Sequence, residues 1–300
     1  MKILITGALG HIGSHIIKNT YKIKKIKKIH LVDNISNERF NLLFEINNKK
    51  FNFIYGDLTN KKFCKKLPKT DVVLHLASIT NAEKSFENKK KVFKNNLGCF
   101  KNVLNYCART GAKLIHISST SVYGDQKGIV NELSKLKPLS PYAEIKRKEE
   151  IVLIKQSKVK YITLRFGTIS GFSKGMRFHT AVNKFCFNAI MKLPIPVWGK
   201  ALNLYRPYLS LKDAFKIIKF ILSKNFFPSE IFNILSENKT VKQILDIIKK
   251  NNHKIKIKYI DSKILNQFAY KTSKEKIEKF DIKLNSKISN DIRETLIKLK

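Results

Sequence analysis

The chain has 300 residues, 43% of them hydrophobic, which is enough for one large folded domain with a smaller companion. Its formal net charge is +38, yet only seven of the 60 basic residues are Arg. The guanidinium of Arg is the group that forms bidentate hydrogen bonds with bases and phosphates. We therefore interpret the excess of Lys as surface composition and expect no specific nucleic-acid partner. The four cysteines lie far apart and form no CxxC motif, which argues against a disulfide framework and against a metal centre.

No segment of the sequence has the length and apolarity of a membrane span. The most apolar stretch, Ala214–Leu222, is interrupted by Lys216 and Lys219. The first apolar run, Ile3–Ile5, has the length of a strand and is followed at once by glycines, which is not the form of a signal peptide. The sequence therefore predicts a cytoplasmic protein without a membrane partner.

Short β-branched runs alternate with helix-like segments through the first half of the chain. The expected strands are Ile3–Thr6, Ile29–Val32, Phe53–Tyr55, Val72–Leu76, Leu114–Ser118 and Tyr161–Arg165. Segments such as Ile12–Tyr21 and Phe93–Arg109 carry apolar residues at helical spacing between them. This alternation predicts an α/β fold with a doubly wound parallel sheet of the Rossmann type, covered by helices on both faces.

The pattern becomes less regular after about Gly171. We expect residues 1–171 to form the Rossmann domain and residues 172–300 to form a smaller C-terminal α/β lobe, with some later segments returning to the Rossmann core. The later elements expected are the helices Thr180–Lys192, Leu211–Ser223 and Val241–Lys250, the strand Phe232–Leu235, and a helical, partly docked tail over Lys271–Lys300.

The first expected strand leads into a glycine-rich turn, TGALGHIG (Thr6–Gly13), and then into a helix. Glycines at positions 7, 10 and 13 permit a tight turn, close approach of backbone N–H groups to a pyrophosphate, and close packing of the helix on the strand. Asp33 ends the second strand, twenty residues past Gly13. Its carboxylate can accept hydrogen bonds from ribose hydroxyls and would repel a 2′-phosphate, so the predicted cofactor is NAD.

A second motif, SPYAEIK (Ser140–Lys146), places Tyr142 and Lys146 four residues apart at the start of an expected helix. That spacing puts both side chains on one face. A phenol has a pKa near 10, and lowering it to about 7 takes roughly 4 kcal/mol, which a nearby ammonium and a helix N-terminus can supply. The hydroxyls of Ser119–Ser121 follow a strand end, where α/β sheets bind ligands. This combination predicts proton removal from a substrate hydroxyl together with hydride exchange with the nicotinamide.

Together these motifs resemble the extended short-chain dehydrogenase/reductases, in the NAD-dependent epimerase/dehydratase branch that includes UDP-glucose 4-epimerase. The resemblance covers the first 171 residues closely, in the order and at the spacings of the family. The matching segments are TGALGHIG (Thr6–Gly13), VDN (Val32–Asn34), GDL (Gly56–Leu58), HLAS (His75–Ser78), NNLG (Asn95–Gly98), ISSTSVYG (Ile117–Gly124), SPYAEIK (Ser140–Lys146) and LRFGTISG (Leu164–Gly171).

The resemblance implies roles for individual residues. Tyr142 is implied to be the base, Lys146 to bind the nicotinamide ribose and act on Tyr142, and Ser119 to hydrogen-bond the sugar hydroxyl. The implied cofactor-binding residues are Gly7, Leu9, Gly10, His11, Ile12, Gly13, Asp33, Asn34, Asp57, Leu58, Leu76, Ala77, Ser78, Asn95, Tyr142 and Lys146. The implied substrate-binding residues are Ser119, Thr120, Thr168, Asn183 and Arg206.

The resemblance also implies a nucleotide-sugar substrate, transient oxidation at the sugar C4, and a homodimer. Sugar 4,6-dehydratases carry an Asp-Glu pair where this chain has Thr120 and Ser121, so dehydration and decarboxylation are disfavoured. The leading interpretation is an NAD-dependent nucleotide-sugar epimerase. The alternative is an NAD(P)H-dependent nucleotide-sugar 4-ketoreductase, which delivers hydride once. A non-catalytic NAD-binding protein is less favoured, because Ser119, Tyr142 and Lys146 are all present.

Overall fold

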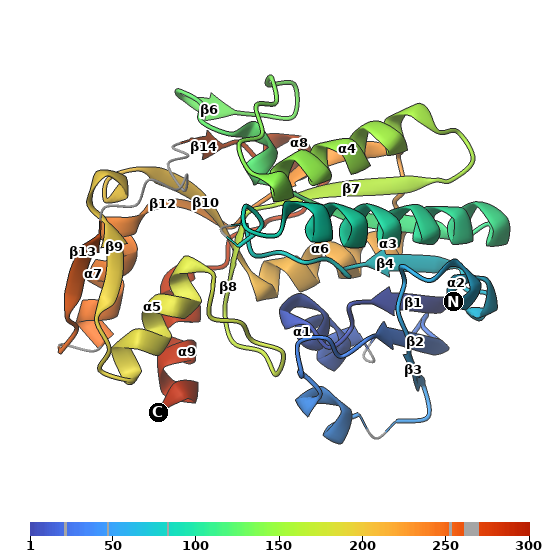
Figure 1. Ribbon diagram of the computed structural model, residues 1–300, viewed down its shortest axis with the longest axis horizontal. Helices are drawn as coiled ribbons and strands as arrows, with labels where there is room; N and C mark the ends of the chain where they lie inside the picture. Colours follow the sequence, from blue (N-terminus) through green and yellow to red (C-terminus); the bar gives the residue numbers. More distant parts are fainter. Residues whose placement is uncertain (21–22, 47, 83, 252–253, 261–269) are drawn as a thin grey trace.

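The computed structural model describes residues 1–20, 23–46, 48–82, 84–251, 254–260 and 270–300. A larger part is built on a seven-stranded parallel sheet, and a smaller part lies beside it (Figure 1). The strand order is β11–β7–β5–β4–β1–β2–β3. The strands are β1 (Lys2–Thr6), β2 (Lys28–Asp33), β3 (Phe51–Tyr55), β4 (Val72–His75), β5 (Lys113–Ser119), β7 (Tyr161–Phe166) and β11 (Glu230–Ile234). The expected Rossmann-type sheet is therefore confirmed.

Helices cover both faces of this sheet. The larger part contains α1 (His11–Thr20), α2 (Lys61–Lys66), α3 (Lys89–Thr110), α4 (Pro141–Lys155) and α6 (Leu211–Lys224), with the 3₁₀ helices η1 (Asn41–Phe44) and η2 (Thr120–Tyr123). On one face α1 packs against α6, and on the other α3 packs against α4. The central strands are buried on both sides, which explains why their sequences are continuous runs of mostly apolar residues. The expected end of the first helix at Tyr21 lies outside the described residues.

The smaller part contains short sheets and three helices of ten residues or more. Its strands are β8 (Thr168–Ser170), β9 (Ile195–Trp198), β10 (Tyr205–Ser210), β12 (Glu237–Thr240) and β13 (Ile257–Ile260), and its helices are α5 (Ala181–Ile190), η3 (Gly199–Ala201), α7 (Val241–Asn251) and α9 (Ile288–Leu299). Strands β6 (Ile129–Val130) and β14 (Lys271–Thr272) pair with each other. Buried residues of α5, α7 and α9, such as Val182, Ile248 and Ile292, form one core.

Several segments after residue 171 return to the larger part. Strand β11 pairs in parallel with β7, and Ile217 of α6 belongs to the core beneath the large sheet. The tail is helical only in α8 (Glu275–Glu278) and α9. Between these helices Ile282 and Leu284 are both buried at a spacing of two residues, which suits extended backbone and not a helix. The expectation of a largely helical tail is therefore wrong over residues 271–274, where β14 lies, and over residues 279–287.

Asp291 anchors α9 to the sheet formed by β12, β10 and β8. Its Oδ2 accepts a hydrogen bond from Ser170 Oγ at 2.6 Å, and its Oδ1 accepts one from Ser210 Oγ at 2.9 Å. The side chain is buried. Burial raises the pKa of Asp291 to about 6 from an ordinary value of 3.8, against the opposing effect of the two serine hydrogen bonds.

We predict that Asp291→Asn removes a pH-dependent cost to stability. Because the pKa is raised in the folded state, the stabilisation from the bound proton is complete below about pH 4 and is lost as the pH rises through about 6. At about pH 8 the free energy of unfolding of the variant should exceed that of the wild type by roughly 2–3 kcal/mol. Near pH 4 the two proteins should have similar free energies of unfolding. Denaturant unfolding at both pH values measures this difference.

The matched control is Asp246→Asn, because Asp246 lies on α7 with its side chain exposed. This control should change the free energy of unfolding little at either pH. An Asp291→Asn effect that is the same at both pH values would contradict the prediction.

Candidate active site

A cavity of about 910 Å³ opens at the carboxyl ends of the central strands. It is lined at the ends of β1, β2, β4, β5 and β7 and, from the smaller part, by residues that include Thr168, Arg206 and Pro207. The strand order reverses beside β1, where β4 lies on one side and β2 on the other. Ligands of open α/β sheets bind at such a reversal.

The glycine-rich turn after β1 fits a dinucleotide pyrophosphate. Gly7 has a φ of +63°, and a Cβ atom there would lie 2.7 Å from the backbone N of Ala77. A Cβ on Gly13 would lie 2.4 Å from the carbonyl oxygen of Ala8. Only glycine satisfies both positions, which lets the backbone approach a phosphate closely at the N-terminus of α1.

The loop before α5 packs directly against this turn. A Cβ on Gly175 would lie 2.2 Å from Leu9 O, and Gly175 N donates to Ser14 Oγ at 2.9 Å. His11 Nδ1 lies 2.7 Å from Ser173 Oγ. Burial holds the pKa of His11 well below its ordinary value, and the charge of Arg177 contributes a smaller effect in the same direction. The ring is therefore neutral. The loop is thus fastened to the phosphate turn.

Asn183 lies behind the cavity wall. It is fully buried, and its Nδ2 lies 3.1 Å from His11 Nε2 and 3.3 Å from the backbone oxygen of Arg177. Asn183 does not line the cavity, unlike the other predicted substrate-binding residues. In this structure it supports the loop and the turn, and its contact with substrate stays a prediction.

Asp33 is held at the cavity edge by backbone groups. Its Oδ2 accepts a hydrogen bond from Leu9 N at 3.0 Å, and its Oδ1 accepts one from Ile35 N at 2.9 Å. Each oxygen keeps a second lone pair for a ribose hydroxyl. Arg39 also lines the cavity, where burial lowers its pKa and the charge of Asp33 raises it. Asp33 thus lies in the cavity lining with free acceptor positions, and its role in selecting NAD stays a prediction.

We predict that Asp33→Ala relaxes the preference for NAD over NADP. Loss of the carboxylate removes hydrogen bonds to the ribose and the repulsion of a 2′-phosphate. The dissociation constant for NADP divided by that for NAD should fall by roughly tenfold or more. The reason is that a hydrogen bond to a charged group contributes roughly 1.5–3 kcal/mol. Calorimetric titration with each cofactor measures the ratio, with exposed Asp246→Asn as the control. An unchanged ratio would remove Asp33 as the selector.

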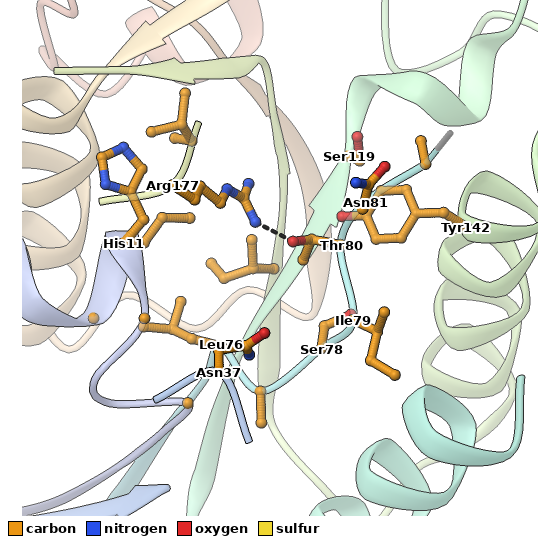
Figure 2. A pocket seen from close by; sticks show the side chains of 18 of the residues that line it. His11, Asn37, Leu76, Ser78, Ile79, Thr80, Asn81, Ser119, Tyr142 and Arg177 are labelled. Atoms are coloured by element: carbon orange, nitrogen blue, oxygen red, sulfur yellow. Dashed lines mark hydrogen bonds between the residues drawn. The ribbon is translucent and has the colours of Figure 1, made fainter. Parts of the chain in front are cut away.

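The three predicted catalytic residues meet at one side of the cavity. Ser119 ends β5, and Tyr142 and Lys146 lie on α4; Figure 2 shows Ser119 and Tyr142 close together on the same side. Ser119 Oγ accepts hydrogen bonds from Ser121 N at 3.2 Å and from Ser121 Oγ at 2.9 Å. Ser119 therefore keeps its own proton for donation. Ser140 Oγ caps α4 by accepting from Ala143 N at 3.2 Å.

Two consecutive carboxylates of α4 face the sheet. Glu150 accepts from Arg165 Nε at 2.9 Å and Nη2 at 2.7 Å, and from Ser118 Oγ at 2.5 Å. Glu149 Oε2 lies 2.8 Å from Lys146 Nζ. Burial lowers the pKa of Lys146, but the negative charge of Glu149 and the charge of Tyr142 outweigh it, so the pKa is raised overall and the ammonium persists.

Arg177 and Thr80 line the cavity although the sequence analysis did not assign them. Arg177 Nη1 donates to Thr80 Oγ1, while its Nε has no hydrogen-bond partner among the described residues. Burial lowers the pKa of Arg177 to about 10. Figure 2 shows its side chain directed toward Thr80, on the side where Tyr142 lies. The signal in the sequence that points to Arg177 is the rarity of Arg in a chain rich in Lys. Three of the seven arginines, at positions 39, 177 and 206, line this cavity.

The cavity thus brings together all sixteen residues predicted to bind the cofactor, and also Ser119, Thr120, Thr168 and Arg206. Within the described part of the chain, no group of three or more His, Cys, Asp or Glu side chains is placed to hold a metal ion. The described helices also include none long and apolar enough to cross a membrane.

The sequence and the fold are similar to those of known proteins. The model of the NAD dependent epimerase/dehydratase family matches residues 3–234. An uncharacterized UDP-glucose epimerase of Bacillus subtilis is 30% identical over 261 residues, which are 83% of this chain and 81% of that protein. The mouse dTDP-D-glucose 4,6-dehydratase is 25% identical over 300 residues, which are 92% of this chain and 82% of that protein.

Two solved structures have the same fold over nearly their whole length. The Thermus thermophilus UDP-glucose 4-epimerase in complex with NAD has a TM-score of 0.88 at 22% identity, covering 100% of this chain and 99% of that one. The UDP-glucuronic acid 4-epimerase of Bacillus cereus, in complex with UDP-glucuronic acid and NAD, has a TM-score of 0.88 at 24% identity with the same coverage.

Proposed function

Because this chain belongs to the NAD-dependent epimerase/dehydratase family, with NAD as its cofactor, we propose that it is a nucleotide-sugar epimerase that inverts C4 by transient oxidation. The observation that carries the proposal is the side of the cavity formed by Ser119 and Tyr142, with Lys146 beside Tyr142. It has the groups for moving a proton at one sugar hydroxyl.

Each of these residues has a defined task in the proposed reaction. Tyr142 takes the proton of the C4 hydroxyl on its phenolic oxygen and later returns it. Ser119 donates its hydroxyl proton to the same sugar oxygen, because its acceptor positions are filled by Ser121. Lys146, whose Nζ lies 5.9 Å from the ring centroid of Tyr142, stabilises the phenolate. NAD, when bound, supplies the hydride acceptor and donor for C4.

The residues after Ser119 favour epimerisation over dehydration. Dehydration requires a further acid and base beside the sugar. Thr120 is buried and its Oγ1 donates to the backbone oxygen of Phe166 at 3.4 Å, while Ser121 Oγ donates to Ser119. A hydroxyl has no acidic proton near neutral pH, so neither residue replaces a carboxyl group.

The cations of the cavity favour a substrate with a diphosphate. Arg206 lines the cavity, and its Nε has no hydrogen-bond partner among the described residues. Arg177 has the same unsatisfied Nε. Both side chains are half-buried, and a buried Nε without an acceptor is costly, a cost that an anionic ligand would offset. We assign Arg206 to the nucleotide diphosphate and Arg177 to an oxygen atom of the substrate nearer Tyr142.

We predict that Tyr142→Phe abolishes turnover while NAD binding persists. Loss of general base catalysis should lower kcat by roughly 10²–10⁴-fold, because the phenolic oxygen has no substitute at that place. Product formation and NAD affinity are measured on the same preparation. The control is Tyr55→Phe, since Tyr55 is 69% exposed on β3 and should leave both unchanged. Undiminished turnover in Tyr142→Phe would remove Tyr142 from the mechanism.

The alternative function, a nucleotide-sugar 4-ketoreductase, uses the same side chains but consumes reduced cofactor. We predict that the purified protein interconverts a 4-epimer pair with no net use of added NAD(P)H. Mass spectrometry of copurifying ligands, followed by a panel of UDP-, GDP- and dTDP-sugars, identifies the substrate. Steady-state turnover that needs one NADH or NADPH per product would contradict the epimerase and support the reductase.

A further inference from the structure

Lys146 shares a buried polar cluster with residues that the proposed reaction does not use. Glu149 Oε2 lies 2.8 Å from Lys146 Nζ and 2.9 Å from His116 Nε2. The other ring nitrogen of His116 lies 3.3 Å from Thr163 Oγ1. The side chains of Lys146, Glu149 and His116 are no more than 5% exposed. The cluster joins α4 to β5 and β7 directly beneath the active site.

We propose that Glu149, held in place by His116, is a positioning residue that fixes the ammonium of Lys146 and sets how strongly that ammonium acts on Tyr142. The inference rests on the proposed function only in taking Tyr142 as the proton-transferring group. The geometry is independent of that function, because the carboxylate, the imidazole and the ammonium meet without any ligand.

Titratable groups of neighbouring elements also face the cluster, but most of them do not change their charge near neutral pH. On β4, burial lowers the pKa of His75 to about 3, and the ring is neutral. On α3, burial raises the pKa of the Cys99 thiol to about 12. On α4, Glu150 is balanced by Arg165 of β7. The charges that interact with the phenol of Tyr142 are therefore those of the cluster, through Lys146, and that of Arg177, which lies outside the cluster and is unchanged in every variant below.

Glu149 has two opposing effects on the proton chemistry. Burial raises the pKa of Glu149, but the charge of Lys146 and the hydrogen bond of His116 lower it to about 2, so the carboxylate is ionised. This negative charge keeps Lys146 protonated. It also cancels part of the attraction between the ammonium and the phenolate of Tyr142. The cluster thus holds a stable ammonium in place while weakening its influence on the phenol.

The test measures ionisation of the phenol, not turnover. The absorbance titration of Tyr142 is obtained as the difference between a protein and its Tyr142→Phe counterpart, in the wild-type and in the Glu149→Gln background. Glu149→Gln keeps the shape and removes the charge. We expect the titration midpoint to fall by about one pH unit or more. If the protein turns over a substrate, both limbs of its pH profile for kcat/KM should move to lower pH, because Lys146 also loses its stabilising partner.

Controls separate the charge effect from a general disturbance of the helix. Glu144 lies on the same helix, its side chain is 38% exposed, and its Oε2 lies 3.8 Å from Lys89 Nζ. Glu144→Gln should therefore leave the titration midpoint of Tyr142 unchanged. Glu149→Asp restores the charge and should return the midpoint most of the way to the wild-type value.

A second variant covers the case in which Glu149→Gln does not fold. Glu149→Met combined with His116→Phe removes both partners of the hydrogen bond between Glu149 and His116, so that neither is left buried without the other. It should show the same lowered midpoint. A folded variant of either kind that keeps the wild-type midpoint would overturn the proposal. Absence of catalysis in the wild type, with the midpoint lowered in the variants as expected, would count against the proposed function alone.

Discussion

The position of α4 depends on the buried pairing of Glu150 with Arg165. Two short N–O contacts and the hydroxyl of Ser118 hold the carboxylate against β5 and β7. Such a pair contributes little net stability, but any rotation of the helix would leave a charge unpaired away from water, which is strongly unfavourable. Tyr142 lies about two turns earlier on the same helix, and Lys146 about one turn earlier. Their orientation toward the cavity is therefore determined by a contact that touches no ligand.

The parts of the fold and site that depend on local sequence could be predicted. Buried parallel strands read as continuous apolar runs, and the phosphate turn requires glycine at positions where a Cβ would collide with the backbone, as at Gly7 and Gly13. The tail is predicted less well, because the buried residues Ile282 and Leu284 are two positions apart, a spacing that suits extended backbone and not the expected helix. Periodicity over so few residues distinguishes the two poorly.

The contacts that the sequence did not reveal are those between distant segments. Glu149 lies in a run of charged residues that is typical of a solvated helix face, and only its packing against His116, 33 positions earlier, places it inside. Arg177 reaches Thr80 across 97 positions. Asn183 was assigned to substrate by resemblance, yet it bonds to His11 of the phosphate turn. In each case the partner is fixed by tertiary structure and not by spacing along the chain.

The close packing of Gly175 on the phosphate turn joins the two parts of the molecule at the place where the cofactor is held. A substrate that contacts both parts would hold this junction closed, and a dinucleotide on the turn would help to order the same loop. If binding of the two ligands is coupled through this junction, then by linkage each tightens the other's binding by the same factor. A protein coupled in this way would retain its dinucleotide most firmly while its substrate is bound.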